Sequence, residues 1–114
     1  MTGCLFCRIA AGETPAKLVF EDAHAIAFED INPQAPHHVL VIPRAHFATL
    51  DDVPGSEEAV LGHMVGVASS IARERGIAKS GYRLVVNCQS AAGQSVFHVH
   101  LHLLGGRSFA WPPG

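Results

Sequence analysis

Three histidines occupy alternate positions near the carboxyl end of the chain, in the segment His98-Val99-His100-Leu101-His102. In a β-strand, side chains two residues apart point to the same face. The sequence therefore predicts a strand with three imidazoles on one face and an apolar opposite face. The residues of that apolar face are Phe97, Val99, Leu101 and Leu103.

Three imidazoles on one face are compatible with two kinds of chemistry and one structural role. Neutral imidazoles could hold a zinc ion with an open position for water. Alternatively, one neutral imidazole could attack an electrophile while its neighbours bind charge or transfer protons. The face could also be an ordinary solvated strand surface. The flexible loops on either side, Gly93-Gln94-Ser95 and Gly105-Gly106, favour a functional site.

The elements that must position these histidines are predicted by the hydrophobic pattern, which indicates an α+β fold with a five-stranded antiparallel sheet. Strands are expected over residues 18–21, 24–28, 39–42 and 82–87 and at the histidine segment. A short helix is expected over residues 5–12, and one long helix over 56–75, capped by Ser56 and stopped by Gly76. The apolar face of the long helix consists of Val60, Leu61, Met64, Val67, Ala68, Ile71 and Ala72.

The composition argues against several classes of protein. A length of 114 residues predicts a single domain, residues 1–114. A net charge of −2 with scattered Lys and Arg argues against nucleic-acid binding. We find no signal peptide and no apolar run approaching the roughly 18 residues of a membrane span. From the lack of such a span we expect that the protein does not act at a membrane. The odd number of cysteines, three, does not suggest a disulfide framework, so we expect a cytoplasmic protein.

The segment from Gly93 to Leu104 resembles the signature of the histidine triad (HIT) family, His-x-His-x-His-x-x with apolar x. The resemblance continues through residues 9–21, 28–36 and 39–46. The closing Trp111-Pro112-Pro113-Gly114, with Ser95 and Gly105-Gly106, is similar to the Hint branch, the purine nucleoside phosphoramidases.

This resemblance implies a homodimeric enzyme without a catalytic cofactor that hydrolyses purine nucleoside phosphoramidates at the α-phosphorus. His100 would be the nucleophile and would form a covalent nucleotidyl-histidine, from which water releases a nucleoside monophosphate such as AMP. The backbone carbonyl of His98 would keep the other nitrogen of His100 protonated. His102 would bind the phosphoryl oxygens, and His38 would belong to the proton-handling set.

The resemblance also assigns the groups that would bind the nucleotide. Asn87, the backbone of Gly93 and the catalytic Ser95 would donate to the phosphoryl oxygens. Asp30 would accept hydrogen bonds from the ribose hydroxyls, although by composition alone it is a turn residue. The apolar base pocket would consist of Leu5, Phe6, Ile9, Phe28 and Ile31.

A second constellation is the pair in Cys4-Leu5-Phe6-Cys7. Alone, it could be half of a zinc site, a redox pair or a pair without a role. Some bacterial HIT proteins, and the related galactose-1-phosphate uridylyltransferases, carry structural zinc on such a pair and two histidines. The matching positions here are His46 and His98, so we expect structural zinc on Cys4, Cys7, His46 and His98. Cys88 is expected to be buried and without a role.

Two alternatives to this enzyme remain open at the level of sequence. In the first, His98, His100 and His102 hold a catalytic zinc, and a chelator abolishes activity. In the second, the chain is a purine nucleotide-binding module with little turnover, and nucleotide affinity survives the substitution His100→Ala. The sequence does not separate binding from catalysis, because both use the same residues.

Overall fold

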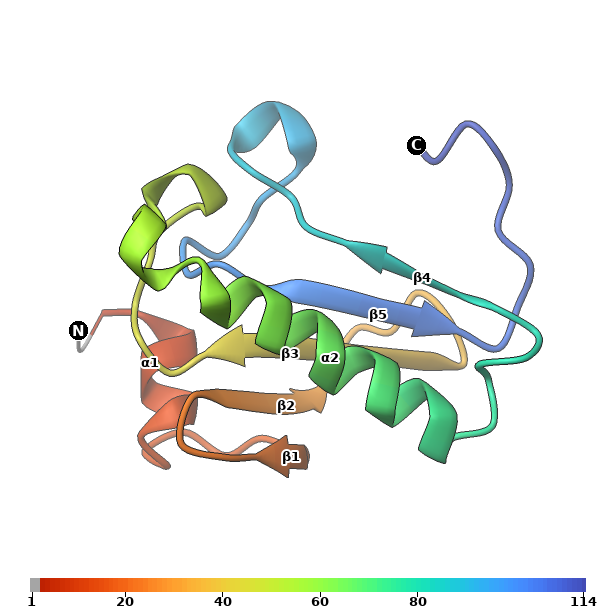
Figure 1. Cartoon of the computed structure of the whole chain (residues 1–114), viewed down its shortest axis with the longest axis horizontal. Coiled ribbons are helices and arrows are strands. Elements are labelled where there is room, and N and C mark those ends of the chain that lie inside the picture. Colours follow the sequence, from red (N-terminus) through yellow and green to blue (C-terminus); the bar gives the residue numbers. More distant parts are fainter. Residues whose placement is uncertain (1–2) are drawn as a thin grey trace.

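Five strands form one antiparallel sheet in the computed structural model, which describes residues 3–114 (Figure 1). The strands are β1 (Leu18–Glu21), β2 (Ala25–Glu29), β3 (His37–Pro43), β4 (Tyr82–Val85) and β5 (Leu101–Gly105). Their order across the sheet is β1-β2-β3-β5-β4, and every neighbouring pair is antiparallel. The predicted α+β fold with a five-stranded antiparallel sheet is confirmed.

The two α-helices pack on opposite faces of this sheet. The long helix α2 (Ala59–Glu74) crosses one face (Figure 1) and forms a core with Ala27, Val39 and Val41. The short helix α1 (Leu5–Ala10) packs its buried residues against the other face, on Ile26, Phe28, Leu40 and Ile42. Alternate residues of β2 and β3 therefore belong to different cores, which explains why the run 39–42 is apolar throughout.

The long helix differs from its prediction at the amino end. It begins at Ala59, after a 3₁₀ turn over Gly55–Glu57, and Glu58 occupies its N-cap without a side-chain hydrogen bond. The predicted cap at Ser56 is wrong, because Ser56 lies inside the 3₁₀ turn and not on the extended residue that a cap requires. At the other end, Gly76 has a φ of 72°, which confirms it as the stop. Among residues 3–114, neither helix is long and apolar enough to cross a membrane.

The histidine segment is a strand only in its second half. β5 begins at Leu101, and residues 96–98 form a bend, so Phe97 is 46% exposed and does not join the apolar face. In the β3–β5 register, where Val41 faces Leu101, Pro43 would face Val99. Proline has no N–H to continue the ladder. The Val99 N–H instead donates to the carbonyl of Phe47, 2.7 Å away.

Candidate active site and metal centre

A cavity of about 330 Å³ lies where α1, the end of β2 and the histidine segment meet. Its lining includes residues predicted for catalysis or nucleotide binding, namely Leu5, Phe6, Ile9, Phe28, Asp30, Ile31, Ser95, His100 and His102. Ile31 is 99% exposed, so it belongs to the rim and not to the interior. Sequence reasoning missed the remaining lining residues, which are Thr14, Pro15, Ala16, Glu29, Leu40 and Val96.

The apolar wall of the cavity is built around Phe6. Its ring makes an edge contact with Phe28, with the centroids 5.4 Å apart, and a perpendicular contact with His100 at 5.1 Å. Phe6 is on α1, whereas Phe28 is on β2, so the packing of that helix on the sheet creates the wall. The wall offers a flat aromatic group an apolar surface beside an imidazole.

His100 has a defined protonation pattern. Its Nδ1 lies 2.8 Å from the carbonyl oxygen of His98, and a carbonyl can only accept, so Nδ1 carries the proton. The lone pair is therefore on Nε2. Burial lowers the pKa of His100 and outweighs the opposing effect of the bond to His98, so the imidazole is neutral near pH 7. A neutral imidazole with a free lone pair is the nucleophilic form.

Two further histidines and a carboxylate adjoin His100. The Nε2 of His38 lies 2.9 Å from the Nδ1 of His102 and 3.3 Å from the carboxylate of Asp30. Burial, followed by the nearby His100 and His38, lowers the pKa of His102 to about 4. The group of Asp30, His38 and His102 is therefore a polar cluster beside the neutral imidazole of His100.

The loop before the histidines is held by a residue that sequence reasoning missed. The side-chain amide of Gln94 donates to the carbonyls of Ala48 (2.8 Å) and Val96 (3.1 Å), and its oxygen accepts from the N–H of Gln89 (2.8 Å). Gln94 is buried, whereas Ser95 beside it is exposed and lines the cavity. A glutamine in a polar loop gives no hydrophobic signal from which its burial could be predicted.

Two of the groups predicted to bind phosphate, the backbone of Gly93 and the side chain of Asn87, do not line the cavity. The Gly93 N–H donates to the carbonyl of Ser90, so it is already satisfied as the loop stands. Asn87 is half-buried after β4, and neither residue lines the cavity. Their binding roles therefore require a change in the loop or a ligand that extends beyond the cavity.

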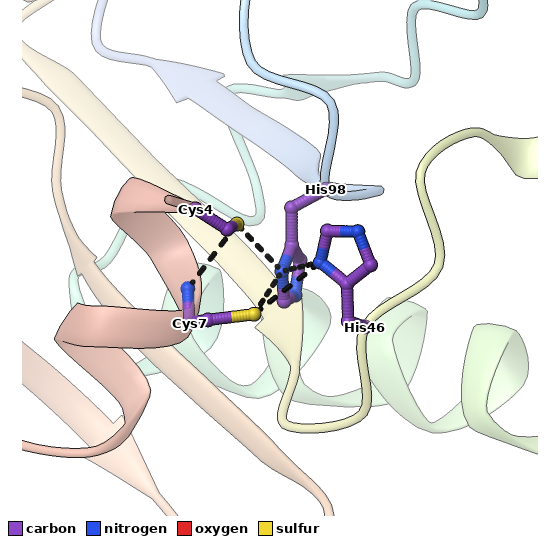
Figure 2. A group of neighbouring side chains, drawn as sticks. All are labelled: Cys4, Cys7, His46 and His98. Carbon is purple, nitrogen blue, oxygen red and sulfur yellow. Dashed lines mark hydrogen bonds between the residues drawn. The ribbon is translucent and has the colours of Figure 1, made fainter. Parts of the chain in front are cut away.

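The side chains of Cys4, Cys7, His46 and His98 converge on one point (Figure 2), with all four ligand atoms within 4.8 Å of one another. The Nδ1 of His98 lies 3.4 Å from the sulfur of Cys4, 3.5 Å from that of Cys7 and 3.2 Å from the Nδ1 of His46. Tetrahedral zinc with ordinary bond lengths would place sulfur about 3.5 Å from nitrogen and two nitrogens about 3.3 Å apart. The residues present therefore fit a structural zinc ion.

The surroundings of His98 support this fit. Its Nε2 donates to the carbonyl of Pro43, 2.8 Å away, which leaves the lone pair on the Nδ1 that faces the sulfurs. Metal-bound histidines commonly carry such a bond on the distal nitrogen. Without a cation, burial raises the pKa of the Cys7 thiol, as does the adjacent Cys4. The third cysteine, Cys88, lies elsewhere and is half-buried, not buried as predicted.

The structure does not support a catalytic zinc on His98, His100 and His102. Within residues 3–114, two groups could hold a metal, one containing His98 with the cysteines and the other containing His102 with Asp30 and His38. His100 belongs to neither. The three side chains diverge because His98 precedes the strand and turns its Nδ1 toward α1.

Comparison of the sequence with known proteins gives matches to the HIT domain and to HIT-like proteins. The sequence model of the HIT domain matches residues 11–109. The purine nucleoside phosphoramidase of Escherichia coli K12 is 47% identical over 103 residues, which is 90% of this chain and 87% of that protein. An uncharacterized HIT-like protein of Synechococcus elongatus is 47% identical over 110 residues, 96% of each chain.

Solved structures agree with these sequence relatives. A HIT family hydrolase from Legionella pneumophila superposes with a TM-score of 0.96 at 52% identity, covering 98% of this chain and all (100%) of that one. A histidine triad protein from Clostridium difficile gives a TM-score of 0.94 at 42% identity, covering 96% of each chain. The chain belongs to the histidine triad family.

Proposed function

We propose that this protein hydrolyses the P–N bond of purine nucleoside phosphoramidates and releases a nucleoside monophosphate such as AMP. The E. coli relative is named a purine nucleoside phosphoramidase, and the Legionella structure is named a HIT family hydrolase. The observation that carries the proposal is the 2.8 Å bond from His100 to the carbonyl of His98, which leaves the lone pair of a buried neutral imidazole on Nε2.

The reaction takes two displacements at phosphorus. In the first, the Nε2 of His100 forms a bond to the α-phosphorus, the P–N bond breaks, and the amine leaves after taking up one proton. In the second, water forms a bond to phosphorus, the bond to Nε2 breaks, and the water releases a proton. In the nucleotidyl-histidine, the Nδ1–H of the His100 imidazolium still donates to the carbonyl of His98, and this hydrogen bond stabilises the positive charge of the ring.

The other residues bind the nucleotide or handle protons. The base occupies the wall formed by Phe6 and Phe28, and Asp30 accepts from the ribose at the edge of the cavity. Ser95 and His102 line the same cavity and donate to the phosphoryl oxygens. We assign His38, in contact with His102, to the proton-handling set.

Intact mass spectrometry tests the covalent mechanism. The wild type and His100→Ala are mixed with adenosine 5′-phosphoramidate and quenched at short times. We expect an acid-labile adduct of one adenylyl group on the wild type together with AMP release, and neither with the variant. AMP formation by His100→Ala at the wild-type rate would contradict the assignment. Nucleotide binding without turnover by the wild type would favour a binding module.

We also propose that zinc on Cys4, Cys7, His46 and His98 has a structural role. The ion would join the start of α1 to the loop that carries His46 and to the segment that carries the nucleophile. Zinc analysis of protein purified without chelator tests this assignment. About one ion per chain is expected, and free thiols at both cysteines with no metal would contradict it.

We further propose that the protein is a homodimer. The exposed face of α2 carries Val65, which is 47% exposed, between Gly62 and Gly66. A Cβ at either glycine would meet nothing within 4 Å, so this face is open to a second copy. The strand β4 also has a free edge, because it is the last strand in the sheet order. Light scattering at micromolar concentration tests the assignment, and a monomeric mass would contradict it.

A further inference from the structure

The segment after β5 packs against the loop that leads to His38. The Nε of Arg107 donates to the carbonyl of Gln34, 3.0 Å away, and its guanidinium lies over the ring of Phe109 with 4.3 Å to the centroid. At Gly106, where φ is +90°, a Cβ would come within 2.9 Å of the Cβ of Pro36. The segment 106–109 therefore holds the loop of residues 30–36 from outside the cavity.

The backbone of Gln34 determines which nitrogen of His38 carries the proton. The Gln34 N–H lies 3.0 Å from the Nδ1 of His38. A backbone amide can only donate, so that Nδ1 must present its lone pair. The neutral imidazole of His38 therefore has its proton on Nε2. A proton on Nδ1 would point directly at the amide hydrogen of Gln34.

The same reasoning extends to His102. Its Nδ1 lies 2.9 Å from the Nε2 of His38, and a contact this short between two nitrogens holds one proton. Because that proton belongs to His38, the Nδ1 of His102 accepts. His102 then carries its own proton on Nε2. The carboxylate of Asp30, 3.3 Å from the same Nε2 of His38, also favours a proton there.

We propose that Arg107 is a positioning residue that, through the backbone of Gln34, holds His38 and His102 in their Nε2–H tautomers. In this state, His102 offers the cavity a neutral N–H donor suited to the phosphoryl oxygens. The kinetic consequence rests on the proposed function, but the tautomers do not. Arg107 is not among the residues that line the cavity, and its hydrogen bonds go to the carbonyls of Gln34 and Ser108, so its role is distinct from the binding and proton-handling roles assigned above.

Nitrogen-15 NMR of the histidine rings tests the tautomers directly. In the wild type, we expect both His38 and His102 to give the Nε2–H pattern. The substitution Arg107→Ala should introduce a measurable Nδ1–H population at His38. Arg83→Ala is the matched control, because Arg83 also lies over Phe109, at 5.1 Å, but bonds to the carbonyl of Ala110 and not to Gln34. We expect this control to resemble the wild type.

Kinetics with adenosine 5′-phosphoramidate provide the second readout. A molecule that loses a complete donor to a transition-state oxyanion loses about 10²–10³ in kcat, so the observed kcat should fall in proportion to the population of the wrong tautomer, about twofold where half of the molecules carry it. The value of KM should change less than twofold, because the apolar wall is untouched. Arg107→Lys, which keeps one donor for the Gln34 carbonyl, should restore part of kcat. Arg83→Ala should keep the wild-type value.

A second pair of variants covers the case in which Arg107→Ala does not fold. Gln34→Pro removes the amide donor to His38, whereas Gln34→Ala keeps it. A change in the His38 tautomer in Gln34→Pro but not in Gln34→Ala would support the proposal. An Nδ1–H pattern in wild-type His38, or unchanged tautomers in a folded Arg107→Ala, would overturn it. Where Arg107→Ala does not fold, unchanged tautomers in Gln34→Pro would do so. If the wild type does not hydrolyse the phosphoramidate, the proposed function fails, while the NMR result still decides the role of Arg107.

Discussion

The substitution Gln94→Glu exchanges one NH₂ group for an oxygen at a buried position. In the wild type, that NH₂ donates to two carbonyls, at 2.8 Å from Ala48 and 3.1 Å from Val96, and the residue is 6% exposed. An ionised carboxylate would face both carbonyls without a proton. We therefore expect the glutamate to bind a proton in the folded state, which keeps one of the two bonds and raises the pKa of the introduced carboxyl.

The loss of stability can be calculated from the free-energy cost of protonating the introduced glutamate. An unperturbed glutamate has a pKa of about 4.3, so binding a proton at pH 7 costs up to (7 − 4.3) × 1.36, or about 3.7 kcal/mol. The lost second bond adds about 1 kcal/mol. The folded-state pKa is raised, so the protonation cost is absent below about pH 4.3 and grows as pH rises toward the folded-state value. The expected loss of stability is about 5 kcal/mol at pH 7 and about 1.5 kcal/mol at pH 4.5.

Urea unfolding of the variant and the wild type at both pH values measures this difference. Subtracting the wild type at each pH removes the contribution of the histidines. Gln89→Glu makes the same chemical change at an exposed position, and its stability should stay within about 0.5 kcal/mol of the wild type. An equal loss for Gln94→Glu at pH 4.5 and pH 7 would refute the reasoning, because it would show that the carboxylate is tolerated without a proton.

Two other predictions concern the metal and the dependence on acid. Cys7→Ser should lower zinc content from about one ion per chain to near zero in elemental analysis, whereas Cys88→Ser should keep it; equal zinc in the two variants would contradict the assigned ligands. The pKa of His102 is about 4 in the folded protein and 6.5 when unperturbed, so the unfolded chain binds more protons between these values. Stability should therefore fall as pH drops through this window, by up to ~1.4 kcal/mol per pH unit for this histidine. Denaturant titrations should show a shallower fall for His102→Gln.

The parts of the fold that follow from local periodicity were predicted correctly. The apolar face of the long helix is buried at Met64, Val67 and Ile71, as its helical spacing indicated. The apolar run 39–42 is a central strand between two cores. Both patterns are properties of neighbouring residues, so they can be recognised without knowing the partner surfaces.

The wrong predictions depend on residues that are distant in the sequence or on burial that the hydrophobic pattern does not indicate. The histidine segment alternates like a strand, but its ladder ends where Pro43, a residue of another strand, lacks an N–H. Gln94 is buried in a loop of polar composition, because its amide satisfies backbone groups of residues 48, 89 and 96. The cavity residues were assigned from the family resemblance, and their spacing alone would not have brought α1 to the histidines.

His98 contributes its side chain to the proposed zinc site and its backbone carbonyl to the candidate active site. Its side chain faces the cysteines and its main-chain oxygen holds the ring of His100. Every amino acid has that oxygen, so replacing the imidazole would remove one of the four proposed zinc ligands while leaving an acceptor for the Nδ1–H of His100. The proposed metal site and the proposed catalytic site are therefore separable in evolution. A lineage could discard the ion together with both cysteines, provided that its new packing held the backbone at this position in place.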